Sequence, residues 1–185
     1  MPAEDATFTI GQPEAALTIN AETTDALCNG DETGTATYTI SGGTPPYTVE
    51  GADFVKINDQ GEYIYYDPAL FAESYTISVN DNTGGCPDFI QFTIGQPDQL
   101  QISVVEQTDA ICFGEESGTA TYAVTGGTPP YTVEGADFVE INEDGAYIYY
   151  DPTLFAGSNI STVTDINSCV PAEDATLLLG SLRHK

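Results

Sequence analysis

The sequence contains very little positive charge. Its 185 residues include 29 aspartates and glutamates but only three lysines and arginines, which gives a formal net charge of −26. Nucleic acids and anionic membranes attract basic surfaces, so this balance excludes both as natural partners. A surface of one sign repels itself unless salt or divalent cations screen it, which favours a saline or calcium-containing exterior. The same acidity would equally serve to keep an extended chain soluble.

Histidine is nearly absent as well, and this limits the possible catalysis. His184, close to the end of the chain, is the only histidine. A serine or cysteine nucleophile would therefore lack a histidine base within the body of the protein. Paired carboxylates for glycoside hydrolysis carry no signal, because among so many acidic residues some pair falls at any required separation. We expect no catalytic residues and predict that the protein is not an enzyme.

Long apolar runs are missing too. No stretch approaches the roughly 20 apolar residues that a membrane-spanning helix needs, so we expect no membrane insertion. No signal-peptide pattern precedes Pro2, and we therefore expect Met1 to be the start of a cut fragment. The sequence also lacks a Cys-x-x-Cys pair, a glycine-rich phosphate loop and a complete EF-hand series. These absences argue against zinc, phosphate and EF-hand sites.

The sequence is dominated instead by a tandem repeat. The step is 84 residues, as from Cys28 to Cys112, and near-identical blocks recur across it, with Gly42–Phe54 repeated as Gly126–Phe138. A catalytic site is rarely needed twice in tandem, whereas a stalk or a multivalent binder gains length or avidity from every added copy. The repeat therefore favours a structural or multivalent role.

A third, partial copy of the repeat sets the boundaries. Residues 8–13 recur as residues 92–97, and residues 2–7 recur as residues 171–176. We therefore expect the chain to open on the last strand of a preceding repeat, with Gly-Gln-Pro as a short, stiff joint between repeats. The predicted divisions are a preceding-repeat strand at 1–13, repeats at 14–97 and 98–180, and a tail at 181–185.

The strand predicted at residues 2–10 has no obvious partner in its own repeat. It can pack against the first repeat, stay disordered, or complete a sheet of a neighbouring molecule by strand addition. The last arrangement would give head-to-tail self-association and an open filament. We rank packing against the first repeat first and strand exchange second.

Strand patterns fill both repeats. Thr35–Ile40, Tyr75–Val79 and Phe89–Ile94 alternate in the way that a half-buried strand requires, and no stretch has the period of an amphipathic helix. Turn signals separate about seven short strands in each repeat. This pattern predicts an all-β fold of two tandem immunoglobulin-like β-sandwich repeats.

One strand of the second copy departs from the first. Asn159 and Ser161 stand where the first copy has Tyr75 and Ile77, which places polar groups on an otherwise apolar face. We expect this strand to be weaker or shifted in the second copy.

Each repeat contains two cysteines. Domains of this size often need an added staple, and an even count of regularly placed cysteines favours disulfides over free thiols, which are the alternative. We predict one disulfide within each repeat, Cys28 with Cys86 and Cys112 with Cys169. Closing each loop would stabilise the fold by roughly 4 kcal/mol. Disulfides imply an oxidising compartment, and therefore an extracellular location on the cell surface.

Calcium is the best-motivated ligand, and no other cofactor is expected. Hard cations bind several oxygens, and acidic residues cluster at turns in matching places of both copies. Solvated turns of an acidic protein carry the same residues, so a purely structural interpretation stays open. The candidate ligands are Asp31, Glu32, Asp81, Asp88, Glu115, Glu116 and Asp165.

Aromatic residues suggest a second binding hypothesis. Tyr63 and Tyr65, matched by Tyr147 and Tyr149, could present ring faces to a surface glycan. A strand with buried rings and hydroxyls at its rim is the simpler interpretation. The segment Thr44–Tyr47 similarly resembles a peptide motif, but a rigid corner between two strands, which can contain a cis bond, explains it with less.

Several of these motifs together resemble the SprB repeat. They are Cys112-Phe-Gly114, Gly118–Thr121, Gly126–Tyr131, Leu154-Phe-Ala156 and Val163-Thr-Asp165 leading to Cys169, with the same series in the first copy. Members of that family often have a tryptophan and a Ser-Asn-Gly turn in the middle of the repeat, where this chain has Val49–Phe54.

The resemblance implies a segment of a very long cell-surface adhesin of Bacteroidota, exported by type IX secretion and, in gliding members, moved along the cell. It implies a structural stalk or filament whose main partners are neighbouring repeats of the same array. A calcium- or glycan-binding module of a surface protein and a strand-exchange fibre subunit are the alternatives.

Overall fold

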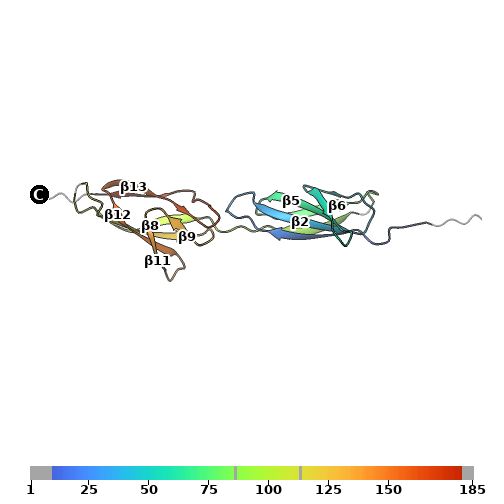
Figure 1. The fold of residues 1–185 in the computed structure, drawn as a ribbon, viewed down its shortest axis with the longest axis horizontal. Helices are drawn as coiled ribbons and strands as arrows, with labels where there is room; N and C mark the ends of the chain where they lie inside the picture. The colour runs from blue at the N-terminus through green and yellow to red at the C-terminus, as the bar shows by residue number, and fades with distance from the viewer. Residues whose placement is uncertain (1–9, 86, 113, 181–185) are drawn as a thin grey trace, which may run out of the picture. The chain divides into compact units, whose positions relative to one another are not determined.

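The structure, a computed structural model, describes residues 10–85, 87–112 and 114–180. Both parts of this chain are built from antiparallel strands joined by turns, and no helix occurs within these ranges (Figure 1). The strand predicted at residues 2–10 lies outside the described residues, except for Ile10, which is exposed. Cys86 and the predicted tail at 181–185 also lie outside them.

The chain divides into two compact units. The first comprises Met1–Asp25 and Glu32–Ile94, and the second comprises Ala26–Asp31 and Gly95–Lys185. The short loop Ala26–Asp31 therefore belongs to the second unit, although its sequence lies inside the first repeat. The chain consequently passes between the two units three times rather than once.

Seven strands form the first unit. They are β1 (Thr18–Thr24), β2 (Gly34–Ser41), β3 (Thr48–Val49), β4 (Asp53–Ile57), β5 (Tyr63–Leu70), β6 (Ser74–Asn80) and β7 (Asp88–Thr93). One sheet has the order β1-β2-β5-β4 and the other has the order β3-β6-β7, with antiparallel pairing throughout. Lettered A to G in chain order, these are the ABED and CFG sheets of a constant-type immunoglobulin sandwich. The predicted fold is confirmed.

Every second residue of β2 contributes its side chain to the core of the first unit. Ala36, Tyr38 and Ile40 are fully buried, whereas the residues between them are partly exposed. The buried side chains cluster with Val79 of β6 and with Ile94 just after β7. One face of the strand thus packs on the core, as the period of two in its sequence predicts. Each large apolar side chain buried in this way contributes about 1.5–3 kcal/mol.

The second unit repeats this architecture with one strand divided. Its strands are β8 (Gln101–Thr108), β9 (Gly118–Thr125), β10 (Thr132–Val133), β11 (Asp137–Ile141), β12 (Tyr147–Leu154), β13 (Gly157–Ser161), β14 (Val163–Thr164) and β15 (Ala175–Leu179). The larger sheet has the order β11-β12-β9-β8, while β10 pairs with β14 and β13 pairs with β15. The single strand β6 of the first unit is thus replaced by β13 and β14, which Thr162 separates. The strand predicted to be weaker is indeed interrupted.

The interruption accompanies a buried hydrogen bond that the first unit lacks. Ser161 is 4% exposed, and its hydroxyl lies 2.6 Å from the buried hydroxyl of Tyr122 and donates to it. In the first unit Ile77 occupies the position of Ser161, and the hydroxyl of Tyr38 is buried without a hydrogen-bond partner. The matching tyrosine hydroxyl is therefore hydrogen-bonded in the second unit and unpaired in the first, where its burial carries the larger desolvation cost.

Removing the two hydroxyls is expected to have opposite effects. Tyr38→Phe deletes a buried hydroxyl that has no partner, so the first unit should become more stable by up to about 1 kcal/mol. Tyr122→Phe leaves the Ser161 hydroxyl buried without its acceptor, so the second unit should lose about 1–3 kcal/mol. Thermal unfolding of the two variants checks this. Equal effects of the two substitutions would contradict it.

The pH dependence of stability provides a second test of the Tyr38→Phe variant. Burial raises the pKa of Tyr38 to about 12, and the nearby Asp67 carboxylate adds to the effect. A raised pKa in the folded state means that the neutral tyrosine stabilises the fold fully below pH 10, the ordinary pKa, and that this contribution is lost as the pH rises through 12. The variant should lose less stability between pH 10 and pH 12 than the original chain does.

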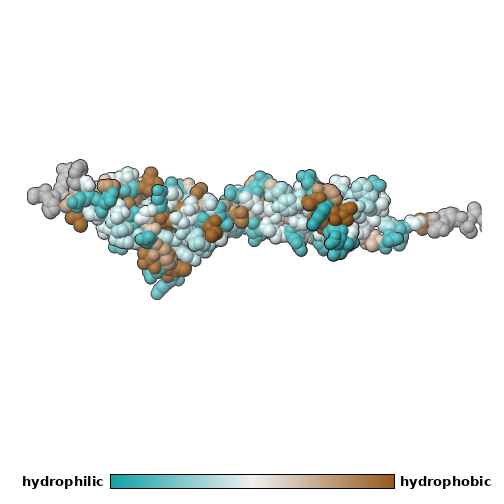
Figure 2. All heavy atoms as spheres, viewed as in Figure 1, coloured by the Kyte–Doolittle hydropathy of each residue, from teal (hydrophilic) through white to brown (hydrophobic). Residues whose placement is uncertain are grey.

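The edge strands β4 and β11 expose apolar side chains. Phe54, Val55 and Ile57 are 50–54% exposed, and their counterparts in β11 are similarly exposed. Figure 2 shows the apolar residues of the β11 hairpin gathered on the surface. Three large apolar side chains are thus exposed together on each of these two short edge strands.

Candidate functional site

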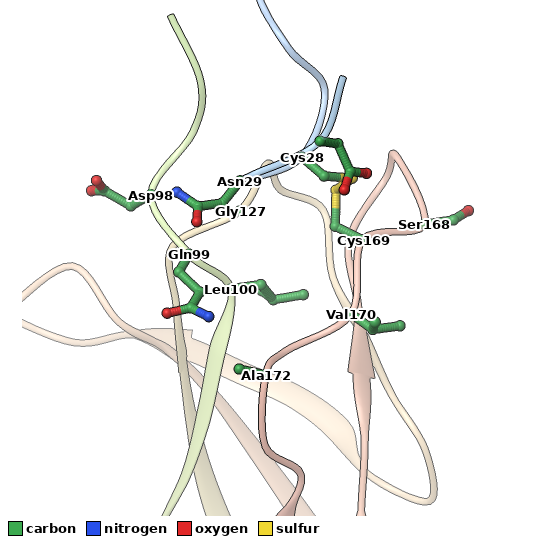
Figure 3. A pocket seen from close by; sticks show the side chains of 11 residues that line it. Cys28, Asn29, Asp98, Gln99, Leu100, Gly127, Ser168, Cys169, Val170 and Ala172 are labelled. Atoms are coloured by element: carbon green, nitrogen blue, oxygen red, sulfur yellow. A yellow bond between two sulfur atoms is a disulfide. The ribbon is translucent and has the colours of Figure 1, made fainter. Parts of the chain in front are cut away.

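The most distinctive chemical feature of the chain is a disulfide between Cys28 and Cys169. The two residues are 141 positions apart in the sequence, and their Cα atoms are 5.6 Å apart. Figure 3 shows the bond between the loop that carries Cys28 and the segment after β14 that carries Cys169. Both cysteines belong to the second unit. The disulfide nevertheless joins a cysteine of the first sequence repeat to one of the second.

The pairing predicted within each repeat is therefore wrong. Cys28 does not pair with Cys86, and Cys169 does not pair with Cys112, whose thiol is free. Cys86 lies outside the described residues. The physical reason is that the loop Ala26–Asp31 leaves its own repeat and packs with the following one, so that Cys28 packs against the core cluster of the second unit.

Hydrogen bonds to the Gly-Gln-Pro joint hold the Cys28 loop in place. The amide of Ala26 donates to the carbonyl of Gly95 at 2.9 Å, the amide of Gly30 to Oε1 of Gln96 at 2.7 Å, and Nδ2 of Asn29 to the carbonyl of Pro97 at 3.0 Å. Gly30 has a φ of +81°, which glycine adopts at little cost. The Gly-Gln-Pro joint therefore links the repeats and also provides the hydrogen-bond acceptors that hold the loop.

Asp165 positions the other half of the disulfide. Its Oδ1 accepts hydrogen bonds from the amides of Asn167 and Cys169, both at 2.9 Å, and its Oδ2 accepts one from the amide of Thr128 at 2.8 Å. The side chain of Asn167 then donates to the carbonyl of Leu27 in the docked loop at 3.2 Å. Asp165 is 6% exposed, so its charge is balanced by these donors rather than by water.

Removing the Asp165 carboxylate should weaken the turn that presents Cys169. Asp165→Ala leaves three backbone amides without their acceptor, and we expect a loss of about 2–4 kcal/mol in the stability of the second unit. Chemical denaturation measures this loss, with the exposed Asp174→Ala as the matched control that should change stability little. Equal stability of Asp165→Ala and Asp174→Ala would show that the network contributes nothing.

Asp81 has the corresponding role in the first unit. Its carboxylate accepts from the amide and hydroxyl of Thr83 at 2.9 and 2.5 Å, and from the amide of Thr44 at 3.0 Å. The Thr83 hydroxyl is the main cause that holds the pKa of Asp81 below its usual value, against the opposing effect of burial. The ionised form therefore stabilises the fold above pH 3.8, and this contribution is lost as the pH falls through the lower folded pKa.

Asp81 and Asp165 also explain the Gly-Gly-Thr-Pro-Pro-Tyr motif. The carboxylate of Asp81 accepts the amide of Thr44 at the start of a corner in which the Pro45–Pro46 bond is cis. The hydroxyl of Tyr47 closes the corner by donating to the carbonyl of Gly42 at 2.5 Å. Gly126–Tyr131 makes the same corner in the second unit, again with a cis proline bond. The predicted rigid corner with a cis bond is confirmed.

The candidate calcium ligands are not gathered into one site. Asp81 and Asp165 accept backbone amides, and Asp88 accepts the amide of Ile19 at 3.2 Å. The remaining candidates, Asp31, Glu32, Glu115 and Glu116, are exposed. Within the described part of the chain, no group of three or more histidine, cysteine, aspartate or glutamate side chains is placed to hold a metal ion. Calcium binding stays a prediction.

The candidate sugar-binding tyrosines belong mainly to the cores. Tyr65 and Tyr149 are buried, and their hydroxyls donate to the carbonyls of Tyr47 and Tyr131 at 2.7 and 2.9 Å. Tyr63 and Tyr147 are partly buried and lie edge-on against the same two tyrosines, at centroid distances of 4.9 Å. This packing agrees with the structural interpretation of the tyrosine strand, and glycan binding stays a prediction.

A small cavity lies beside the disulfide. Its volume is about 220 Å³, and it is lined by residues that include Asp31, Asp98, Leu100 and Ala172 (Figure 3). Ligand pockets usually enclose about 300–1,000 Å³, so this cavity is small for a substrate. The arrangement is suited to holding the two cysteines together rather than to binding a ligand.

Comparison with known families confirms the resemblance seen in the sequence. The SprB repeat family matches residues 20–48 and 104–132, which include Cys28 and Cys112. None of the curated proteins with which the chain was compared is similar to it. No helix in the described part of the chain is long and apolar enough to cross a membrane.

Several solved structures resemble the chain. The Escherichia coli adhesin FdeC shares 17% identity, with 95% of this chain and 67% of that chain covered and a TM-score of 0.34. The I67–I69 fragment from the I-band of titin shares 11% identity, with coverage of 93% and 67% and a TM-score of 0.43. Domains 4–9 of the surface layer protein SbsC share 15% identity, with coverage of 92% and 32% and a TM-score of 0.30.

Proposed function

We propose that this chain, which contains two segments that match the SprB repeat, is a structural segment of a long adhesin on the surface of a bacterial cell. In this role the repeats supply length and mechanical strength, and the adhesive tip lies elsewhere. The observation that carries the proposal is the disulfide between Cys28 and Cys169, because it ties one repeat of the sequence into the fold of the next. A binding module or an enzyme would not need a covalent bond between successive repeats.

The finer parts of the proposal follow from the family. SprB repeats imply a Bacteroidota source, export by type IX secretion, and a setting in gliding motility or surface attachment. An extracellular location agrees with a disulfide, which persists in oxidising compartments. The acidic surface, with a formal net charge of −26, agrees with a partner that is neither nucleic acid nor anionic membrane.

A replacement experiment in the organism that makes the protein tests the structural role. Residues 14–180 would be exchanged, in the full-length protein, for two unrelated immunoglobulin-like domains of equal total length, and in a second strain they would be deleted. A spacer predicts that the exchanged strain attaches to surfaces as the parent does. Antibody labelling of intact cells confirms that each variant protein is displayed.

The binding alternative predicts a different outcome. If these repeats hold the adhesive site, the exchanged strain attaches as poorly as the deletion strain, although both display the protein. In that case the exposed apolar residues Phe54 and Phe138 are the first to replace, because they lie at matching positions on the edge strands of both copies.

A further inference from the structure

In the second unit, the loop Ala26–Asp31 sits on a defined surface. Cys28 borders one cavity together with Asp98–Leu100, Gly127 and Cys169 (Figure 3). These residues come from the start of the second repeat, from its Gly-Gly corner and from the turn after β14. The loop therefore has a receptor surface, built from three segments of the repeat that follows it.

The first unit has the corresponding surface, and no loop of the described residues is docked on it in this way. Asp98–Leu100 correspond to Ala15–Leu17 of the first unit, because the amide of Gly43 donates to the carbonyl of Ala15 as the amide of Gly127 donates to that of Asp98. Ala15–Leu17, Gly43 and Pro87 line a hollow of about 640 Å³, whereas the docked loop of the second unit borders a cavity of about 220 Å³ that adjoins another of about 370 Å³. The hollow of the first unit therefore lies at the place where the Cys28 loop sits in the second unit.

The second unit also carries a loop of its own that matches the docked one. The amide of Ala110 donates to the carbonyl of Gly180 at 3.1 Å, and the amide of Glu115 to the carbonyl of Cys112 at 3.4 Å. The corresponding bonds of the Cys28 loop measure 2.9 and 3.3 Å, and the glycine two residues after each cysteine has a φ of +81°. Cys112 is thus held as Cys28 is held, but with a free thiol.

We propose that Cys112 forms a disulfide with the second cysteine of a following copy of this repeat, with the loop Ala110–Glu115 seated in the hollow of that copy. The occupant of the hollow is thus the Cys28-type loop of the preceding copy. The inference rests on the proposed function only in that it requires an array. Two thiols join in one S–S bond, and the two protons and two electrons pass to a disulfide oxidant, such as glutathione disulfide, which is reduced to two thiols.

Such bonds would link every repeat to the next along the array. Each repeat would give its first cysteine to the copy that follows it and its second cysteine to the copy that precedes it. We call such an array a covalent ladder, because a disulfide joins each pair of adjacent repeats in addition to the peptide chain. The observed Cys28–Cys169 bond is one rung of this ladder.

A three-repeat chain tests the proposal. Residues 96–180 would be appended after Gly180, which restores the Gly-Gln-Pro joint and raises the number of cysteines from four to six. After dilute oxidation with glutathione disulfide, unfolding and alkylation, mass spectrometry counts the free thiols. The ladder predicts two, namely Cys86 and the first cysteine of the third copy. Four free thiols, or none as expected from pairing within repeats, would overturn the proposal.

The variant Cys112→Ser in the same chain identifies the bond. It should raise the count from two free thiols to three, because the second cysteine of the third copy loses its partner. An unchanged count would overturn the assignment to Cys112. The thiol count reports only on the bond between copies. If the count excludes that bond but the exchanged strain still attaches, the structural role is kept and the disulfide proposal is rejected. If the count shows the bond but the exchanged strain does not attach, the disulfide proposal is kept and the structural role is rejected.

Discussion

Replacing Cys28 with serine is expected to lower the free energy of unfolding of the second unit by about 3–5 kcal/mol. The bridge closes a loop with a sequence separation of 141 residues, and loop-closure entropy grows with loop length. The substitution also removes the packing of the Cys28 side chain against the core cluster of the second unit. For a unit of this size the loss corresponds to a fall of more than about 10 °C in melting temperature, measured under oxidising conditions.

Two controls accompany this prediction. Cys112→Ser removes a free thiol and should shift the melting temperature of the two-repeat chain very little. Hydrogen exchange measured by mass spectrometry shows which unit is affected, because faster exchange should be concentrated in strands β8 to β15. If Cys112→Ser destabilised the chain as much as Cys28→Ser does, the assigned pairing would be contradicted.

Stretching the oxidised chain by its two ends is expected to extend only the residues outside the bridge. Force applied at the ends passes from Cys28 directly to Cys169 through the disulfide, so the residues between them carry no load. The 27 residues before Cys28 and the 16 after Cys169 can extend to about 150 Å. After reduction, the segment between the two cysteines should add up to about 500 Å of contour length.

Single-molecule force spectroscopy makes this measurement. The oxidised chain should lack the long unfolding steps of whole immunoglobulin-like units, and a reductant should restore them. Cys28→Ser should show the long steps without reductant, while Cys112→Ser should behave as the original chain does. Long steps in the oxidised original chain would contradict the bridge and, with it, the role of the disulfide in carrying tension.

A bridge of this kind gives a stalk a specific mechanical property. Tension along the array would be carried by covalent bonds, and most strands would be shielded from it. Immunoglobulin-like domains are otherwise held by hydrogen bonds and apolar packing, with a total stability of only about 5–15 kcal/mol per domain. The free energy of folding would then no longer limit the force that the segment can withstand.

The fold could be predicted from the sequence because its signals are local. Alternation in segments such as Thr35–Ile40 gives the strands, and turn residues such as Gly42 and Gly43 place the corners between them. The interrupted strand could be predicted too, because Asn159 and Ser161 break an apolar face. The hydrogen bond from Ser161 to Tyr122 could not, since it depends on which residue faces which across the sandwich.

The disulfide pairing could not be predicted, for a reason particular to tandem arrays. Pairing within a repeat and pairing with the next repeat produce the same spacing pattern, because a shift by one whole repeat leaves the sequence almost unchanged. The choice depends on whether the loop Ala26–Asp31 folds onto its own repeat or onto the following one. The hydrogen bonds that decide it run to Gly95, Gln96 and Pro97, which the sequence indicates only as a joint.

The role of the acidic residues could be predicted least well from the sequence. Asp81 and Asp165 were candidate calcium ligands because they stand at turns in an acidic protein, yet their carboxylates accept backbone amides and hold corners. A sequence does not show whether a carboxylate at a turn faces an amide or a cation. The repeated Gly-Gly-Thr-Pro-Pro-Tyr motif was the available signal, because a corner that rigid needs an acceptor for its amides.

Peptide mapping of the oxidised chain without reduction tests the central claim most directly. After proteolysis, the peptide that contains Cys28 should be recovered bonded to the peptide that contains Cys169, and the peptide with Cys112 should carry a free thiol. Recovery of Cys28 bonded to Cys86, together with Cys112 bonded to Cys169, would contradict a bridge that ties one repeat to the next.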